Sequence, residues 1–350
     1  MDRRFLGFST RTWTIVIAAL VVALIAPLFV LDRFNTIEFA YVWAFAIALI
    51  GLNVLTGFSG QISLGNGAFM AIGAYVTAIL YYKLQLPYLW TILPAGLVAG
   101  LAGYLFGFPA LKLSGLYLAL ATFALALSTS PVIKNFGSLT NGHEGIVLPS
   151  VTDPFGLGLT NEQWLYYLAL VIGVLMFLFG RAMLGGATGR ALRAIRDSET
   201  AAAANGISVA QFKTMAFGVS AFYAGVAGSL FATITAYVNP DSFDLPLSLS
   251  LLVGMVVGGL GTLAGPVLGA TFVVWLPIYA QQIFRNKPDV AYGLILILLM
   301  FLMPQGIMGL VRQVIGWIRR RSGPVEPSAE LADMGPAAPP HAAERGTGGS

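Results

Sequence analysis

The sequence predicts an all-α, polytopic integral membrane protein with about ten transmembrane helices. Of its 350 residues, 57% are hydrophobic and only 10% are charged, whereas soluble domains usually carry about 25% charged residues. The apolar residues fall into runs of roughly 20, which is the length that an α-helix needs to cross a bilayer. The chain has no cysteine, so disulfides, thiolate chemistry and cysteine metal sites are excluded.

Ten apolar runs mark the predicted spans. They cover residues 13–31, 39–56, 66–82, 89–107, 115–133, 163–180, 209–237, 246–264, 267–284 and 290–311. The first run lacks a small-residue cleavage site, so we interpret it as a retained helix and not as a signal peptide. The fifth run is the least apolar, because Thr122, Ser128, Thr129 and Ser130 dilute it. Only a Gly/Pro break separates the eighth run from the ninth, and the two could form one bent unit.

Ten spans put both termini on the same side of the membrane, and the basic residues indicate which side. Lys and Arg are enriched in cytoplasmic loops. With the N-terminus inside, 14 of the 19 basic residues lie in inside segments and 5 in outside segments. We therefore expect a transmembrane domain over residues 1–312 with both termini cytoplasmic. Residues 313–350 are rich in Pro, Ala and Gly, and we expect them to form a disordered cytoplasmic tail.

The charged residues lie in loops, at span edges and in the tail, which limits the classes of function. Proton-driven carriers commonly place carboxylates or histidines within the membrane, whereas His143 lies in an outside loop and His341 in the tail. A membrane-embedded enzyme would need a nucleophile–base pair or a metal cluster at depth, and the sequence offers neither. The net charge of +4 follows from the topology, so nucleic acid is not an expected partner.

Residues 51–69, with the sequence GLNVLTGFSGQISLGNGAF, interrupt a stretch in which a spanning helix would otherwise continue. Non-helical backbone at membrane depth is tolerated only where it is buried in protein or lines a water-filled cavity. A Gly-interrupted segment therefore indicates a transport pathway, although glycines can also serve only to pack helices closely, as we expect for Gly103 and Gly107. The predicted pathway residues are Asn53, Gly57, Ser59, Gly60, Gln61, Ser63, Gly65, Asn66 and Gly67. The run GGLGTLAGPVLGA at 258–270 is a second broken element that could face the same cavity.

The longest inside segment, residues 183–213, is predicted to be largely helical because it is rich in Ala, Leu and Arg. Arg193 and Asp197 are spaced to pair along a helix, and Asn205 with Gly206 is a helix stop. Basic side chains followed by a patch of small residues at 201–204 suit a surface that docks against another protein. The alternative is ordinary cytoplasmic positive charge that fixes the orientation of the chain.

Three stretches together resemble the permease subunits of branched-chain amino acid ABC importers. They are GLNVLTGFSGQISLGNGAFMAIGAY, GRALRAIRDSETAAAANGISVAQFK and GGLGTLAGPVLGA. The resemblance extends from about residue 40 to 312 and is closest to the M-type member of a two-permease pair, and permeases for urea and short amides share the pattern. It implies a permease, not an enzyme, in the bacterial cytoplasmic (inner) membrane for branched-chain or other hydrophobic, neutral amino acids. The implied partners are a second related permease, two cytoplasmic ATPases and a periplasmic or extracellular binding protein.

The resemblance also implies that residues 190–206 form a coupling helix that inserts into a groove on the ATPase. Such loops often carry a Glu-Ala-Ala-x-x-x-Gly pattern. Here Thr200 occupies the position of the glutamate, and the acidic residue, Glu199, lies one position before it. The predicted coupling residues are Arg190, Arg193, Arg196, Asp197, Glu199, Ala201, Ala202 and Gly206. No GxxxxGK[ST] phosphate loop occurs in the chain, so we expect no cofactor here and ATP bound by the partner ATPase. A sodium-coupled carrier stays open as an alternative, because sodium can bind backbone carbonyls at broken helices.

Overall fold

The computed structural model describes residues 21–25, 27, 31–151, 153, 156, 158–283, 293–295, 298, 301 and 306–310. The chain divides into two units, Met1–Leu310 and Val311–Ser350, and the second unit lies outside the described residues. Large parts of the predicted first and tenth spans, at 13–31 and 290–311, and the whole predicted tail at 313–350 also lie outside them. All the described residues therefore belong to the first unit.

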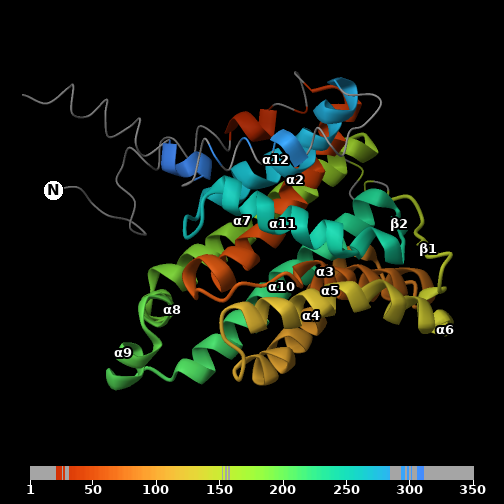
Figure 1. Cartoon of the computed structure of the whole chain (residues 1–350). Helices are drawn as coiled ribbons and strands as arrows, with labels where there is room; N and C mark the ends of the chain where they lie inside the picture. The colour runs from red at the N-terminus through yellow and green to blue at the C-terminus, as the bar shows by residue number, and fades with distance from the viewer. Residues whose placement is uncertain are drawn as a thin grey trace, which may run out of the picture. The chain divides into compact units, whose positions relative to one another are not determined.

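Helices dominate the described residues (Figure 1). In chain order they are α2 (Arg33–Leu52), the π-helix η1 (Asn53–Phe58), α3 (Asn66–Ala78), the π-helix η2 (Ile79–Lys83), α4 (Tyr88–Ala110), α5 (Leu116–Asn135), α6 (Gly137–Thr140), α7 (Asn161–Gly185), α8 (Ala187–Asp197), α9 (Glu199–Ala204), α10 (Val209–Thr235), the 3-10 helix η3 (Pro240–Phe243), α11 (Leu245–Gly258) and α12 (Gly265–Ile283). Two short strands, β1 (Ile146–Val147) and β2 (Tyr237–Val238), pair antiparallel with Ile146 opposite Val238.

The prediction of an all-α membrane protein is confirmed by this arrangement. Six of the described helices are long and apolar enough to cross a membrane. α3, which continues into η2, and α12 occupy two further predicted spans, at 66–82 and 267–284. The predicted eighth span, 246–264, is too long, because α11 ends at Gly258 and the following backbone is not helical.

The hydroxyl groups that dilute the fifth span do not prevent α5 from forming. Thr122 donates to the carbonyl of Leu118 at 3.1 Å, and Thr129 donates to that of Leu125 at 2.8 Å. Both acceptors lie one turn earlier in the same helix, so these hydroxyls find partners without water. A hydroxyl satisfied in this way costs little in an apolar environment.

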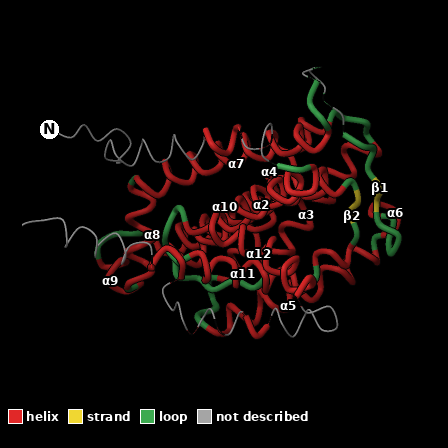
Figure 2. Tube along the Cα trace, turned by 90° about the horizontal axis from the view of Figure 1, so that it is seen from above, coloured by secondary structure: helices red, strands yellow, loops and turns green. Residues whose placement is uncertain are grey.

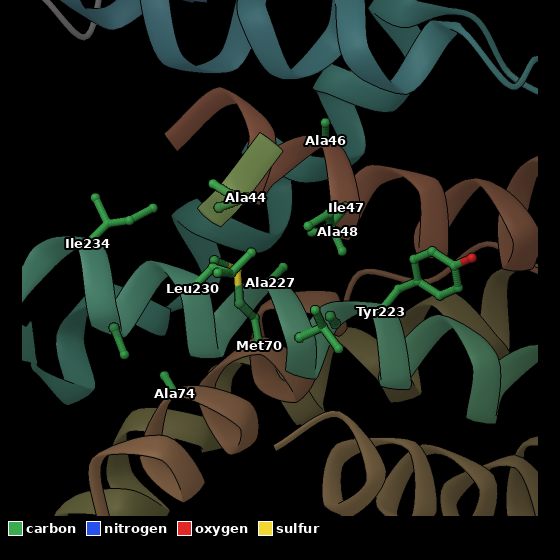
Figure 3. Close-up of a cluster of buried hydrophobic side chains, with 14 of the residues drawn as sticks. Ala44, Ala46, Ile47, Ala48, Met70, Ala74, Tyr223, Ala227, Leu230 and Ile234 are labelled. Atoms are coloured by element: carbon green, nitrogen blue, oxygen red, sulfur yellow. The ribbon is translucent and has the colours of Figure 1, made fainter. Parts of the chain in front are cut away.

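The core lies where α10 packs against α2, α3 and α4. Figure 3 shows Ile47 of α2, Met70 of α3 and Leu230 of α10 converging there, and each is at most 1% exposed. Small residues bring the backbones close, because a Cβ atom added to Gly103 of α4 would lie 2.2 Å from the Cβ of Ala221 in α10. This contact is of the close-packing kind that we expect for Gly103.

The loops gather in two groups at opposite ends of the helices. α8 and α9 lie at one end, and α6, β1 and β2 lie at the other (Figures 1 and 2). At the second end, the Nζ atom of Lys83 donates to the carbonyl of Ser138 at 2.6 Å, and Lys134 pairs with Asp241 at 2.5 Å. Loops predicted to lie on the same side of the membrane therefore contact one another.

Candidate functional site

The Gly-rich segment interrupts the helix, as the sequence predicts. α2 passes directly into the wider turns of η1, and residues 59–65, which we call the first break, are not helical before α3 begins at Asn66. The amide of Ser59 donates to the carbonyl of Val54 at 3.1 Å, which is the five-residue spacing of a π-turn. A second π-helix, η2, ends α3, so the feature that distinguishes the Gly-rich segment is the non-helical backbone that follows η1.

The polar side chains predicted for the pathway are buried and bonded within the chain. Each of Asn53, Ser59, Gln61, Ser63 and Asn66 is at most 5% exposed. The amide Nε2 of Gln61 donates to Oγ of Ser59 at 2.7 Å. Asn66 donates to a carbonyl of α2 at 3.4 Å and accepts a hydrogen bond from a serine of α10 at 3.3 Å. In this conformation the segment therefore joins α2 to α10.

Hydroxyl groups from three other helices also bond to this segment, and the sequence alone did not identify them as site residues. Thr122 of α5 accepts from the amide of Leu64 at 2.9 Å, and Ser248 of α11 accepts from that of Gly67 at 3.1 Å. The third is Ser220, the serine of α10 that donates to Asn66. In the sequence such a residue is visible only as an isolated Ser or Thr within an apolar span. For Thr122 its effect is to make the fifth span less apolar.

The exposed edge of the first break is formed by Gly60 and Ile62. Gly60 is exposed, and the side chain of Ile62 is 47% exposed. Gly60 has a φ of +76°, a backbone conformation that glycine adopts without a steric cost. The exposed Arg196 lies beside Gly60, because a Cβ atom added to Gly60 would be 3.1 Å from Cγ of Arg196. A ligand or partner that approached this edge would therefore meet backbone, an aliphatic side chain and an arginine.

The two broken elements form one hydrogen-bonded unit. Residues 259–264, which we call the second break, connect α11 to α12. Nδ2 of Asn53 donates to the carbonyl of Thr262 at 2.6 Å, and its Oδ1 accepts from the amide of Gly261 at 2.9 Å. A Cβ atom added to Gly57 would lie 2.7 Å from the nitrogen of Gly261, so the close approach requires glycine there.

Residues 190–206, which the resemblance implies to be one coupling helix, span two helices, α8 and α9. Between α8 and α9, Ser198 is extended, and its Oγ accepts from the amide of Ala201 at 3.3 Å as an N-cap. α9 ends at Ala204, and Gly206 follows with a φ of +79°. The predicted stop at Asn205 and Gly206 is therefore right.

The faces of α8 and α9 differ in character. α8 buries Leu192 and Ile195, which are 0% and 2% exposed, and leaves Arg190, Arg193, Arg196 and Asp197 on the outside. α9 buries Ala202 and exposes its other residues. The exposed surface is therefore mostly basic along α8, and along α9 it is formed by Glu199 and small side chains.

The charged residues of this segment contact other elements more than one another. The guanidinium of Arg193 lies 5.9 Å from the centre of the Phe58 ring in η1. Between described residues the ion pairs are Lys134–Asp241 and Lys213–Glu199, so the pair that the spacing of Arg193 and Asp197 would allow is not formed. The aromatic ring of a neighbouring element competes for this arginine.

Glu199, the acidic residue that lies one position before the usual place in the pattern, forms an ion pair within the chain. Its Oε1 lies 2.5 Å from Nζ of Lys213 in α10. The side chain of Lys213 is only 9% exposed, whereas that of Glu199 is 53% exposed. A buried lysine needs a partner for its charge, so this pair holds α9 against α10.

The segment 183–213 also reaches η1, which leads into the first break. Nη1 of Arg196, in the last turn of α8, donates to the carbonyl of Gly57 at 2.6 Å. Within the described ranges no three His, Asp or Glu side chains come together as ligands for a metal ion would. The site is therefore a joint between helices, built from backbone groups, amides, hydroxyls and one arginine.

Comparison with known proteins covers most of the chain. Residues 36–303 match the family model for the permease component of branched-chain amino acid transport systems. The chain is 34% identical over 331 residues to the high-affinity branched-chain amino acid transport system permease protein LivM of Escherichia coli (strain K12), covering 87% of this chain and 77% of that protein. The protein of the same name from Salmonella typhimurium is 33% identical over the same shares. A probable branched-chain amino acid transport permease from Methanocaldococcus jannaschii is 22% identical over 62% of this chain and 67% of that protein. No solved structure matches the chain.

Proposed function

This chain belongs to the family of permease components of branched-chain amino acid transport systems, and on that basis we propose that it is a permease subunit of an ABC importer for branched-chain or other hydrophobic, neutral amino acids. The observation that carries the proposal is the extent of the family match, since residues 36–303 include both breaks and the whole of the segment 183–213. A urea or short-amide permease and a sodium-coupled carrier are less favoured, because all three relatives are named for branched-chain amino acid transport.

The translocation pathway runs along the exposed edge of the first break, at the surface that faces the second permease. Gln61, Ser63 and Asn66 exchange their bonds within the chain for transient bonds to the passing zwitterion when α3 tilts. Such an exchange is feasible because one hydrogen bond contributes only about 0.5–1.5 kcal/mol net. The exposed side chain of Ile62 adds an apolar contact of the kind that a branched aliphatic side chain prefers.

The segment 183–213 is the coupling element for the ATPase. The exposed small residues of α9 and the exposed Arg190 of α8 fit a docking surface, and the ATPase binds the ATP. A second related permease and a periplasmic or extracellular binding protein complete the importer. Ligand delivery takes place at the opposite end, near β1 and β2.

The topology has ten spans with both termini in the cytoplasm, and residues 313–350 form a cytoplasmic tail. One contact supports placing two of the inside segments on the same side of the membrane. Residues 57–65 and α8 are both expected inside, and Arg196 of α8 contacts Gly57 and Gly60.

The test is uptake into proteoliposomes that contain this chain and its co-purifying partners. Radiolabelled leucine and urea are compared with and without ATP and with and without the binding protein. We expect leucine entry that requires both ATP and the binding protein. Entry of urea alone would identify the chain as part of an ABC importer for urea. Leucine entry driven by a sodium gradient without ATP would contradict the proposal.

A further inference from the structure

Arg196 occupies a position that its basic character alone does not explain. Although the residue is exposed, its guanidinium donates to the carbonyl of Gly57, with the Nη1 and O atoms 2.6 Å apart. Gly57 lies in the last turn of η1, where carbonyls have no donor within the helix. A cation at the end of a helix is also favoured by the helix dipole. The bond therefore satisfies a carbonyl that the first break leaves open.

Glycines of both breaks make room for this side chain. A Cβ atom added to Gly60 would lie 3.1 Å from Cγ of Arg196, and one added to Gly261 would lie 3.1 Å from its Nη1. Both glycines have positive φ, +76° and +69°. The side chain of Arg196 therefore lies against one glycine of the first break and one of the second.

The breaks are in turn joined to each other by Asn53, which bonds to the backbone of Gly261 and Thr262. One arginine of α8 thus contacts a unit that includes η1, the first break and the second break. Among the described residues its guanidinium takes part in no ion pair, so the carbonyl of Gly57 is the polar partner that the structure gives it. A hydrogen bond from a charged donor is stronger than one between neutral groups.

We propose that Arg196 is a positioning residue that ties α8 to both breaks, so that movement of α8 is transmitted to the two breaks together. This inference rests on the proposed function, because it assumes that an ATPase moves the segment 183–213. It differs from the prediction made for Arg196 from the sequence, which placed this residue on the ATPase surface. Arg190 and Arg193 keep the assignment to that surface.

The experiment compares variants in the complete importer, with the second permease, the ATPases and the binding protein present. For Arg196→Gln we expect normal amounts of co-purified ATPase and continued ATP hydrolysis. The leucine transported per ATP hydrolysed should fall about tenfold or more, the size expected when a charge-assisted hydrogen bond is lost. Arg196→Lys keeps one charged donor, so it should restore part of this ratio.

Lys112→Gln is the control, because it also removes one positive charge from an exposed residue in a loop that is expected on the same side of the membrane. It should leave both the amount of bound ATPase and the ratio of leucine to ATP unchanged. Loss of ATPase from the Arg196→Gln complex would place Arg196 on the ATPase surface and overturn the proposal. A normal transport ratio in that variant would overturn it as well.

A second readout reports on the first break itself. The chain has no cysteine, so Ile62→Cys introduces a single thiol at an exposed position of the break. Its labelling by a maleimide should change when the ATPases are trapped with nucleotide, and Arg196→Gln should abolish that change. An unaltered response in Arg196→Gln would overturn the proposal. Failure of the proposed function is seen separately, as absence of ATP-dependent leucine uptake by the unmodified chain.

Discussion

The contact between α3 and α10 and the joint between the two breaks both depend on glycine, but for different reasons. In the first region, a Cβ atom added to Gly73 would lie 2.1 Å from the carbonyl oxygen of Gly225, and one added to Gly228 would lie 1.9 Å from that of Met70. Here two helix backbones touch directly. In the second region Gly57 also lies close to the backbone of Gly261, but Gly60 and Gly261 have positive φ, and hydrogen bonds hold the chain segments together.

The difference separates a fixed part of the molecule from a part that can rearrange. Backbones in direct contact have one arrangement, because packed interiors tolerate neither added volume nor sliding. Hydrogen bonds between buried groups can be exchanged for others at small net cost, although leaving a group unpaired costs about 1–3 kcal/mol. We therefore expect changes at α3 and α10 to prevent folding, and changes at the joint to impair transport in a protein that still assembles.

The largest effect is expected for Gly228→Val. The added side chain would meet the backbone of Met70, which cannot move without displacing α3 from α10. Overpacking of this kind typically costs about 1–3 kcal/mol and occasionally more, so the yield of monodisperse protein in detergent should fall to near background. Gly185→Ala is the control, because nothing lies within 4 Å of a Cβ atom added there. A normal yield of Gly228→Val would show that the contact is not fixed.

An intermediate effect is expected for Asn53→Ala at the joint. The change leaves the carbonyl of Thr262 and the amide of Gly261 without the partner that they have now. Each loss costs about 1–3 kcal/mol for a buried group, so the melting temperature should fall while the protein still inserts. ATP-dependent uptake should drop by about tenfold, the equivalent of about 1.4 kcal/mol.

Asn53→Asp sharpens this test, because it keeps the acceptor for the amide of Gly261 and removes the donor to Thr262. We expect it to transport no better than Asn53→Ala, since it buries a carboxylate beside a carbonyl. If either variant had normal uptake together with a lowered melting temperature, the joint would serve stability alone.

Local sequence patterns are sufficient to predict some features of both regions. Runs of about 20 apolar residues locate helices because a spanning segment must pair all its backbone groups internally. The helix stop at Gly206 and the interruption before Asn66 are visible because glycine marks them locally. The structure bears out both.

The features that the sequence could not predict depend on residues far apart in the chain. Thr122 and Ser248 bond to the first break from α5 and α11, and a single sequence does not show which spans are neighbours. For the same reason the spacing of Arg193 and Asp197 suggested a pair, whereas in the fold the ring of Phe58 contacts this arginine instead. The local sign of a partner such as Thr122 is a hydroxyl group within a less apolar span.

The smallest effect is expected for Glu199→Gln, at the edge of the region that can rearrange. Glu199 is half exposed, and an ion pair with one exposed partner contributes at most about 1 kcal/mol. The amide of glutamine still accepts a hydrogen bond from Lys213, so folding and insertion should be unchanged. We expect ATPase stimulation by substrate to fall less than about fivefold, within that energy.

Lys213→Met is the matched change on the other side of the pair, because methionine fills the buried space without a charge. If Glu199 acts through Lys213, both variants should lower ATPase stimulation to the same degree, and the double variant should be no worse than either one. If Glu199 instead contacts the ATPase, the two effects should add, and Glu199→Gln alone should reduce the amount of co-purified ATPase. The double-mutant cycle therefore decides whether Glu199 acts through its ion pair with Lys213 or through the surface that docks the ATPase.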